Sequence, residues 1–110
     1  MERLKFLMSG SEGDEYAVSF EISGSNANAF CTCMAGSNGQ YCKHRFAIMD
    51  GDVSRLLSDN TADVVRLKTL MQGTDLEAAY ERVLKASTVL DTAKKEFDAA
   101  KKVLAKVMYK

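Results

Sequence analysis

The sequence has few residues that could crosslink the chain, with three cysteines and one histidine among 110 residues. An odd number of cysteines argues against a closed disulfide framework. No apolar run is long enough to span a membrane, and the first residues lack the charged-then-apolar pattern of a signal peptide. We therefore expect a cytoplasmic protein without a membrane partner, whose cysteines stay reduced and can hold a metal.

The chain also lacks an overall charge, because 15 Lys and Arg residues balance 15 Asp and Glu residues. The charge is unevenly distributed: residues 1–60 carry a net −3 and residues 61–110 a net +3. A site of three thiolates, one imidazole and one Zn²⁺ would add about one further negative charge to the first part. A negatively charged N-terminal part argues against phosphate binding there.

Recognisable enzyme motifs are missing too. The sequence contains no Gly-rich phosphate loop and no paired-acid motif. If zinc binds every cysteine and the histidine, only carboxylates, hydroxyls and lysines remain for chemistry. We expect that the protein is not an enzyme and has no catalytic residues.

The spacing of apolar residues predicts an α+β fold. Residues 3–8 and 15–22 alternate apolar and polar side chains, which is typical of half-buried strands, and we expect them to form an antiparallel hairpin. A turn at 23–28 then leads to the cysteines. Because a two-stranded hairpin is not stable alone, its apolar face needs a cover, which short helices after the cysteines can supply.

All four metal-type ligands lie within fourteen residues, as Cys31-x-Cys33 and Cys42-x-His44. Three thiolates and one imidazole make a complete tetrahedral set, which predicts one structural Zn²⁺ ion with no position left for catalysis. In extended backbone, residues i and i+2 face the same side, so Cys31 and Cys33 can reach one ion. Within a helix, residues i and i+2 lie about 200° apart, so Cys42 and His44 cannot both face one ion from inside the same helix. Cys42 must therefore end the loop, and His44 must begin a helix.

Two other interpretations of these residues remain open. The three cysteines are small enough to be ordinary core residues near a chance surface histidine. The Cys-x-Cys pair also suits redox chemistry, although that interpretation leaves Cys42 and His44 without a role.

The pattern Cys-x-Cys, eight residues, Cys-x-His resembles the SWIM-type zinc finger. The resemblance covers residues 15–51: a strand precedes the cysteines, and Lys43-His44 opens an apolar helix. Members of this family occur in ATPases, in Mutator-type transposases and as small stand-alone bacterial proteins, which this chain would resemble with an added C-terminal helix. The resemblance implies a ββα zinc module for DNA binding or protein–protein contacts. The metal ligands it implies are Cys31, Cys33, Cys42 and His44.

Helix signals fill the rest of the chain. Residues 61–72 have helical apolar spacing and end at Gly73. Thr74 and Glu77 have capping-box spacing, and no Gly or Pro follows through Lys110, which predicts one helix about 50 Å long. We expect two domains: a SWIM-like zinc finger at residues 1–60, and a helical hairpin at 61–110 with a long amphipathic helix.

A heptad repeat runs along this long helix, with large residues at position a and mostly alanine at position d. The stripe could pack on the protein's own domain, but helix 61–72 is only about 18 Å long and would cover a part of it. We therefore expect a coiled-coil homodimer. Its a-position residues are Leu76, Val83, Leu90, Phe97 and Leu104.

Lysines gather near the C-terminal end and are candidates for nucleic-acid contacts. An alternative role for these lysines is to complement the helix dipole and keep one face of the helix solvated. The cluster also has no arginine and no exposed aromatic row, which nucleic-acid-binding surfaces commonly have. The candidate residues are Lys94, Lys95, Lys101, Lys102 and Lys106.

Together these patterns favour a zinc-binding adaptor that dimerises and binds an unidentified protein partner. The alternative is a DNA-binding accessory protein that contacts nucleic acid through the basic C-terminal helix.

Overall fold

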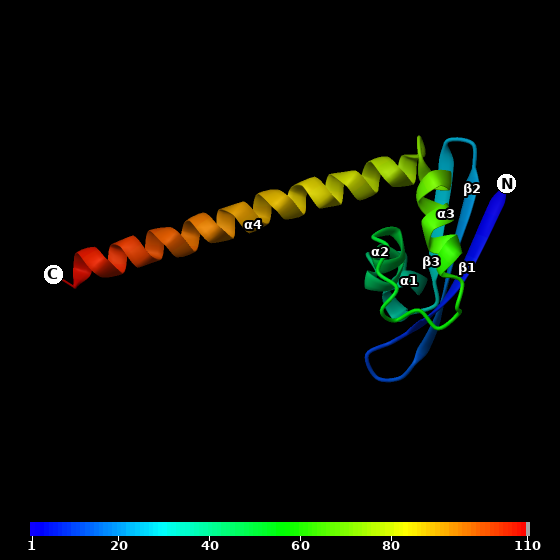
Figure 1. Ribbon diagram of the computed structural model, residues 1–110, viewed down its shortest axis with the longest axis horizontal. Coiled ribbons are helices and arrows are strands. Elements are labelled where there is room, and N and C mark those ends of the chain that lie inside the picture. The colour runs from blue at the N-terminus through cyan, green and yellow to red at the C-terminus, as the bar shows by residue number, and fades with distance from the viewer. Residues whose placement is uncertain (110) are drawn as a thin grey trace. The chain divides into compact units, whose positions relative to one another are not determined.

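The computed structural model describes residues 1–109 and confirms the predicted α+β fold (Figure 1). Its strands form one antiparallel sheet in the order β1-β2-β3. The strands are β1 (Glu2–Ser9), β2 (Glu15–Ser23) and β3 (Asn26–Cys31). The helices are α1 (Met34–Ser37), α2 (Lys43–Met49), α3 (Thr61–Met71) and α4 (Asp75–Met108).

The sheet has one strand more than the predicted hairpin. The turn predicted at 23–28 is wrong in extent, since only Gly24 and Ser25 connect β2 to β3, and Ser23 already pairs with Asn26. Strand β3 escaped prediction because its sequence is Asn-Ala-Asn-Ala-Phe-Cys, where small and amide side chains replace the branched residues typical of strands. This strand positions the site, because it ends at Cys31.

Alternate residues of β1 and β2 form the core. Phe6 and Phe20 meet edge to face with ring centroids 6.0 Å apart, and both side chains are fully buried. Each such burial stabilises the fold by about 1.5–3 kcal/mol. Helices α2 and α3 cover this face of the sheet. They contribute the buried side chains Ile48, Val64, Leu67 and Met71.

Both edges of the sheet have hydrogen-bonding partners. Along β1, the backbone N–H of Leu57 donates to the carbonyl of Leu7 at 2.7 Å. Along β3, the backbone N–H of Ala27 donates to the carboxylate of Asp75 at 2.9 Å, which ties the start of α4 to the sheet. These contacts occupy edge groups that would otherwise pair with another chain.

The chain divides into two compact units, Met1–Ala78 and Ala79–Lys110, whereas we expected a boundary after residue 60. Helix α3 contacts both β1 and α2 and buries Val64, Leu67 and Met71 against them. It therefore belongs to the N-terminal unit.

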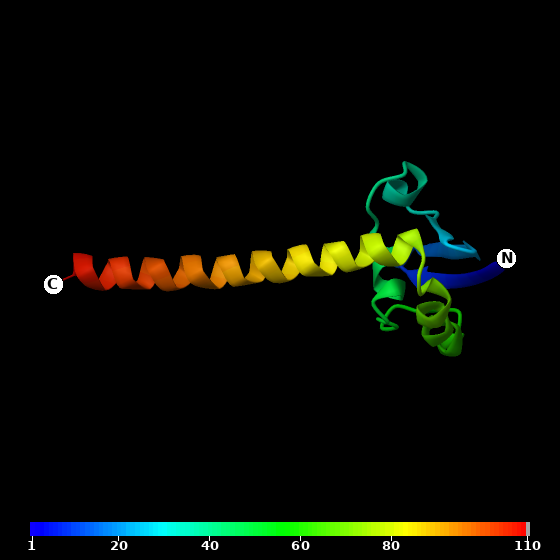
Figure 2. The same cartoon turned by 90° about the horizontal axis from the view of Figure 1, so that it is seen from above.

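Helix α4 is one unbroken element, as the sequence predicts (Figure 2). Its N-terminal cap differs from a regular capping box. The hydroxyl of Thr74 accepts from the N–H of Glu77 at 3.2 Å, but the carboxylate of Glu77 accepts from Gly73 at 3.0 Å rather than from Thr74. Lys110, to which the expected helix extends, lies outside the described residues. Within residues 1–109, no helix combines the length and apolar character needed to cross a bilayer.

Candidate metal centre

The four predicted ligands come from the ends of three neighbouring elements. Cys31 ends β3, and Cys33 is the N-cap of α1. Cys42 is the N-cap of α2 with extended backbone angles (φ −136°, ψ 124°), and His44 lies in the first turn of that helix. The prediction that Cys42 ends the loop and His44 begins a helix is confirmed.

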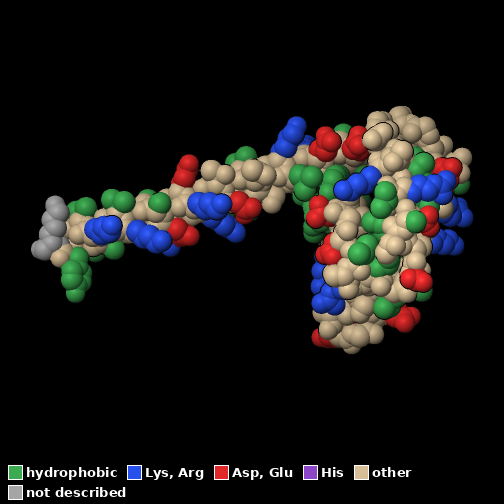
Figure 3. All heavy atoms as spheres, in the orientation of Figure 1, with side chains coloured by type: hydrophobic (Ala, Val, Ile, Leu, Met, Phe, Trp, Pro, Cys, Tyr) green, Lys and Arg blue, Asp and Glu red, His purple; other side chains and the backbone are tan. Residues whose placement is uncertain are grey.

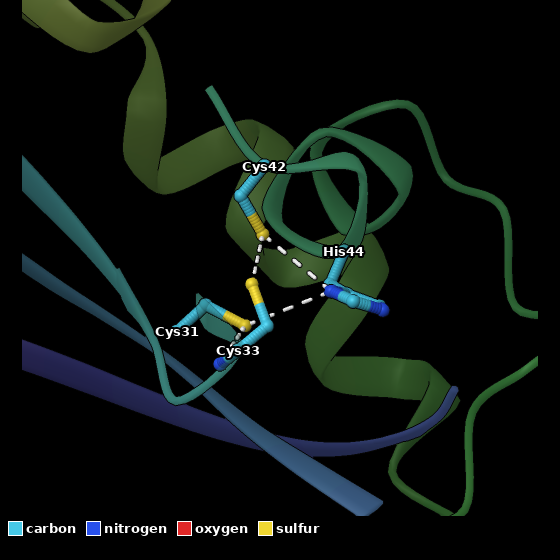
Figure 4. A group of neighbouring side chains, drawn as sticks. All are labelled: Cys31, Cys33, Cys42 and His44. Atoms are coloured by element: carbon cyan, nitrogen blue, oxygen red, sulfur yellow. Dashed lines mark hydrogen bonds between the residues drawn. The ribbon is translucent and has the colours of Figure 1, made fainter. Parts of the chain in front are cut away.

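The four side chains converge on one point (Figure 4). The Sγ atoms of Cys33 and Cys42 are 3.3 Å apart, and Nδ1 of His44 lies 3.6 Å from Sγ of Cys42 and 3.8 Å from Sγ of Cys31. All four ligand atoms lie within 4.8 Å of one another. A zinc tetrahedron has edges of about 3.8 Å between sulfurs and about 3.6 Å between sulfur and nitrogen. The cluster is therefore close to the size of a metal's first shell and can hold an ion.

Burial excludes water from this cluster. The three cysteines and His44 are each 4–7% exposed, and no disulfide links the cysteines. Four protein atoms fill a tetrahedral shell, so the arrangement suits a structural ion rather than one that binds a substrate.

Backbone N–H groups support the thiolates. Cys33 donates to Sγ of Cys31 at 3.5 Å, and Gly36 donates to Sγ of Cys33 at 3.3 Å. A side chain at Gly36 would meet Cys31, because a Cβ built there would lie 2.7 Å from both the Cβ and the carbonyl oxygen of Cys31. Glycine suits any loop, so composition alone does not single out Gly36; its place three residues after Cys33 is the signal of this contact.

The His44 ring is held between the sulfurs and Tyr16. The two ring centroids are 4.7 Å apart, with Nδ1 of His44 facing the cysteines and Nε2 pointing away (Figure 4). Nε2 is buried and has no hydrogen-bond partner among residues 1–109. With a metal on Nδ1, Nε2 carries the proton and needs an acceptor. His44 lines a cavity of about 190 Å³, whose lining also includes the polar residues Ser9, Ser11 and Asp52.

The pKa values of the candidate ligands are shifted in different directions. Burial raises the pKa of the Cys31 thiol to about 12. Burial also opposes ionisation of Cys42, but hydrogen bonds from the backbone N–H of Arg45 and from neighbouring thiols outweigh it and lower its pKa. Burial, then the charges of Lys43 and Arg55, lower the pKa of His44, so its imidazole is neutral at pH 7 and ready to bind a metal.

Arg45 connects strand β3, which ends at Cys31, to the loop before Cys42. Its guanidinium donates to the carbonyl of Ala29 on β3 at 3.0 Å and to the carbonyl of Gln40 in the loop before Cys42. The sequence alone assigns no role to Arg45, because an arginine two residues after a lysine resembles ordinary surface charge.

The predicted dimerisation residues differ in their surroundings. Leu76 packs partly buried against the core of the N-terminal unit. Val83, Leu90, Phe97 and Leu104 are 42–64% exposed.

The predicted nucleic-acid-binding lysines are all exposed along α4, where blue side chains alternate with red ones (Figure 3). Lys101 lies 3.5 Å from the carboxylate of Asp98 and 4.6 Å from the ring centroid of Phe97. These contacts satisfy Lys101 within its own helix.

The sheet, α1 and α2 therefore bring the four side chains together in a closed, buried Cys₃His site. The spacing in the sequence predicts the four candidate ligands, and the fold places Tyr16, Gly36 and Arg45 beside them. No protein-family model, curated protein or solved structure matches this chain.

Proposed function

We propose that this protein is a non-enzymatic zinc-binding finger of the SWIM type, an adaptor that binds a protein partner and dimerises through α4. The observation that carries the proposal is the buried Cys₃His cluster of tetrahedral size. Three thiolates with one imidazole favour Zn²⁺, whereas carboxylate-rich sites favour Mg²⁺ or Ca²⁺. A reducing compartment such as the cytoplasm keeps these thiols free to bind the ion.

The outer face of the sheet offers a surface for a protein partner. A groove of about 500 Å³ lies there, and its exposed large apolar side chains are Leu7 and Phe30. Lys5, Ser19 and Thr32 line the same groove. An apolar patch with a polar rim is typical of protein interaction sites.

A pull-down from native lysate tests this proposal. The bait is the metal-loaded full chain, compared with a Leu7→Ser/Phe30→Ser variant of the groove and with Cys42→Ser. A Val65→Ser variant is the matched control, because Val65 is an apolar residue 71% exposed on α3. We expect a protein partner that both test variants lose and the control keeps. Recovery of nucleic acid alone, or a partner that the groove variant still captures, would contradict the adaptor role.

The alternative function is DNA binding through α4. It is favoured by the exposure of all five candidate lysines, which occupy heptad positions e, f and c, outside the a and d stripe. It is opposed by Asp98, which pairs with Lys101 among them. Fluorescence anisotropy with a DNA duplex at 50–200 mM salt distinguishes the two functions, since phosphate contacts give a steep loss of affinity with salt. Binding that is absent at all salt concentrations would leave the adaptor role alone.

A further inference from the structure

The exposed stripe of α4 has an unusual alternation of sizes. From residue 79 to residue 104, position a holds Val83, Leu90, Phe97 and Leu104, and every d position holds alanine. The large side chains are all exposed in the single chain. Since Leu76 already packs on the N-terminal unit, the seam that is free for a partner begins at Ala79.

A parallel dimer in register fits this seam poorly. Each layer would contain the same residue twice, so that Phe97 meets its own copy and Ala93 meets its own copy. Two large side chains hold helix axes near 10 Å, and two alanines need them near 8 Å, within the usual range of about 8–10 Å. Successive layers lie only about 5 Å apart, so two regular helices cannot alternate between these separations without leaving voids.

We propose that two copies of α4 pair antiparallel, about a two-fold axis between Asp91 and Thr92. This inference rests on the proposed dimer and specifies its geometry. Each large a residue then packs against an alanine at d, so the layer volumes vary much less than in the parallel pair. Ala79 faces Leu104 of the partner subunit, Val83 faces Ala100 of the partner subunit, Ala86 faces Phe97 of the partner subunit, and Leu90 faces Ala93 of the partner subunit.

Exposed valines beside the seam support a second copy as the occupant, because Val89 and Val103 at position g are 69% and 62% exposed in the single chain. In an antiparallel pair the g positions of the two helices flank the same side of the seam. Val89 at g then lies within about 3 Å, along the helix axes, of the level of Glu96 of the partner subunit, and Val103 lies likewise beside Arg82 of the partner subunit, so the aliphatic stems of the charged residues cover the valines. On the other flank, Lys94 lies near the two-fold axis, where its long side chain extends into solvent.

This geometry gives the adaptor a defined span. Because α4 starts at Asp75 in each chain, an antiparallel pair joins its two metal-binding units to opposite ends, about 50 Å apart along the helices. A partner that engages both units must therefore present two separate sites, and linked binding at both would raise its overall affinity.

Spin-label distance measurement on the full, metal-loaded chain tests the proposal. The label is attached to a ketone-bearing amino acid at Thr92 or at Lys106, both exposed, so the cysteines stay untouched. The antiparallel pair predicts a distance below about 25 Å at residue 92 and an axial separation of about 44 Å at residue 106. Short distances at both positions would overturn the antiparallel geometry and leave the dimer standing. Absence of any distance at micromolar concentration would contradict the dimer itself.

Matched alanine variants test which face forms the contact. Ala93→Glu places a carboxylate against Leu90 of the partner subunit, whereas Ala99→Glu makes the same change at position c, away from the seam. Since a buried unpaired charge is costly, we expect Ala93→Glu to weaken dimerisation at least about tenfold and Ala99→Glu to leave it unchanged in sedimentation equilibrium. Equal effects of the two variants would contradict the seam.

Discussion

At the scale of single residues, the metal centre depends on side chains that are not ligands. Tyr16 packs on one face of the His44 ring, and Arg45 joins β3 to the loop before Cys42. Gly36 lets the backbone of α1 approach Cys31 and donate to Cys33. Such supporting contacts orient first-shell ligands and commonly change metal affinity by about 10–100-fold when removed.

Gly36→Ala should weaken metal binding at least about tenfold, because its new methyl would lie 2.7 Å from the Cβ and the carbonyl of Cys31. Competition with a chromophoric chelator measures the affinity. Met34→Ala is the control, since Met34 is in the same short helix and 83% exposed. Equal affinities for the two variants would show that the close approach has no role in the site.

Metal binding should release protons, and metal affinity should rise with pH. The pKa of Cys31 is raised to about 12 without a metal, so this thiol is protonated at pH 7 and must lose its proton to bind. His44 has a lowered pKa and is already neutral, so it contributes no proton at this pH. Calorimetry in two buffers with different ionisation enthalpies measures the release. A binding heat independent of the buffer would contradict this prediction.

At the scale of elements, strand β3 and helix α3 determine how the ligands meet. Strand β3 places Cys31 opposite Val18 on β2, in the buried layer of the sheet. Helix α3 lies against β1 and against α2, the helix that carries His44. Together they belong to the unit whose buried core includes the three cysteines.

Leu67→Ala should lower the free energy of unfolding of the N-terminal unit by about 2–5 kcal/mol, because Leu67 is fully buried and its loss leaves a cavity. Thermal or urea unfolding of the metal-loaded protein measures the change. Val65→Ala, on the exposed side of the same helix, should change it by less than about 0.5 kcal/mol. Similar losses for both variants would mean that α3 does not pack on the sheet.

At the scale of the whole molecule, the chain consists of two units with different sources of stability. Residues 1–78 bury a core around the metal cluster, whereas from residue 79 α4 has no buried residue up to residue 109. A long helix without a buried face gains most of its stability from a partner. The two units should therefore respond separately to metal removal and to dilution.

Chelation of the metal should unfold the N-terminal unit, because small domains gain much of their folding free energy from such an ion. Circular dichroism melting and limited proteolysis before and after verified metal removal measure this effect. Cys42→Ser, which lacks one ligand, should be unaffected by the chelator. An unchanged melting curve after metal removal from the parent protein would contradict a structural metal.

A chain that ends at Ala78 should remain folded and bind metal, but stay monomeric at concentrations where the full chain dimerises. The reason is that its core residues all lie before residue 79. Light scattering gives the mass, and metal titration gives the binding. A truncated chain that still dimerises would place the interface in the N-terminal unit.

Much of this fold follows from local patterns. Alternation in β1 and β2, the Gly73 stop and the Thr74 start all correspond to observed boundaries. Strand β3 was not predictable, because Ala27 and Ala29 pack well only against a neighbour that the sequence does not reveal. The short helix α1 lies in the eight residues between the two ligand pairs, where the spacing of the ligands predicts no element.

The sequence by itself determined the ligand set, since Cys31, Cys33, Cys42 and His44 are the whole supply of such residues and their spacing fits one ion. Only the tertiary structure decided what surrounds them. The tilted contact of the Tyr16 ring with His44, the close approach at Gly36 and the hydrogen bonds of Arg45 each join residues that are distant in sequence or depend on backbone geometry. Ligand identity is a property of residue chemistry, whereas ligand support is a property of packing, and packing exists only once the chain has folded.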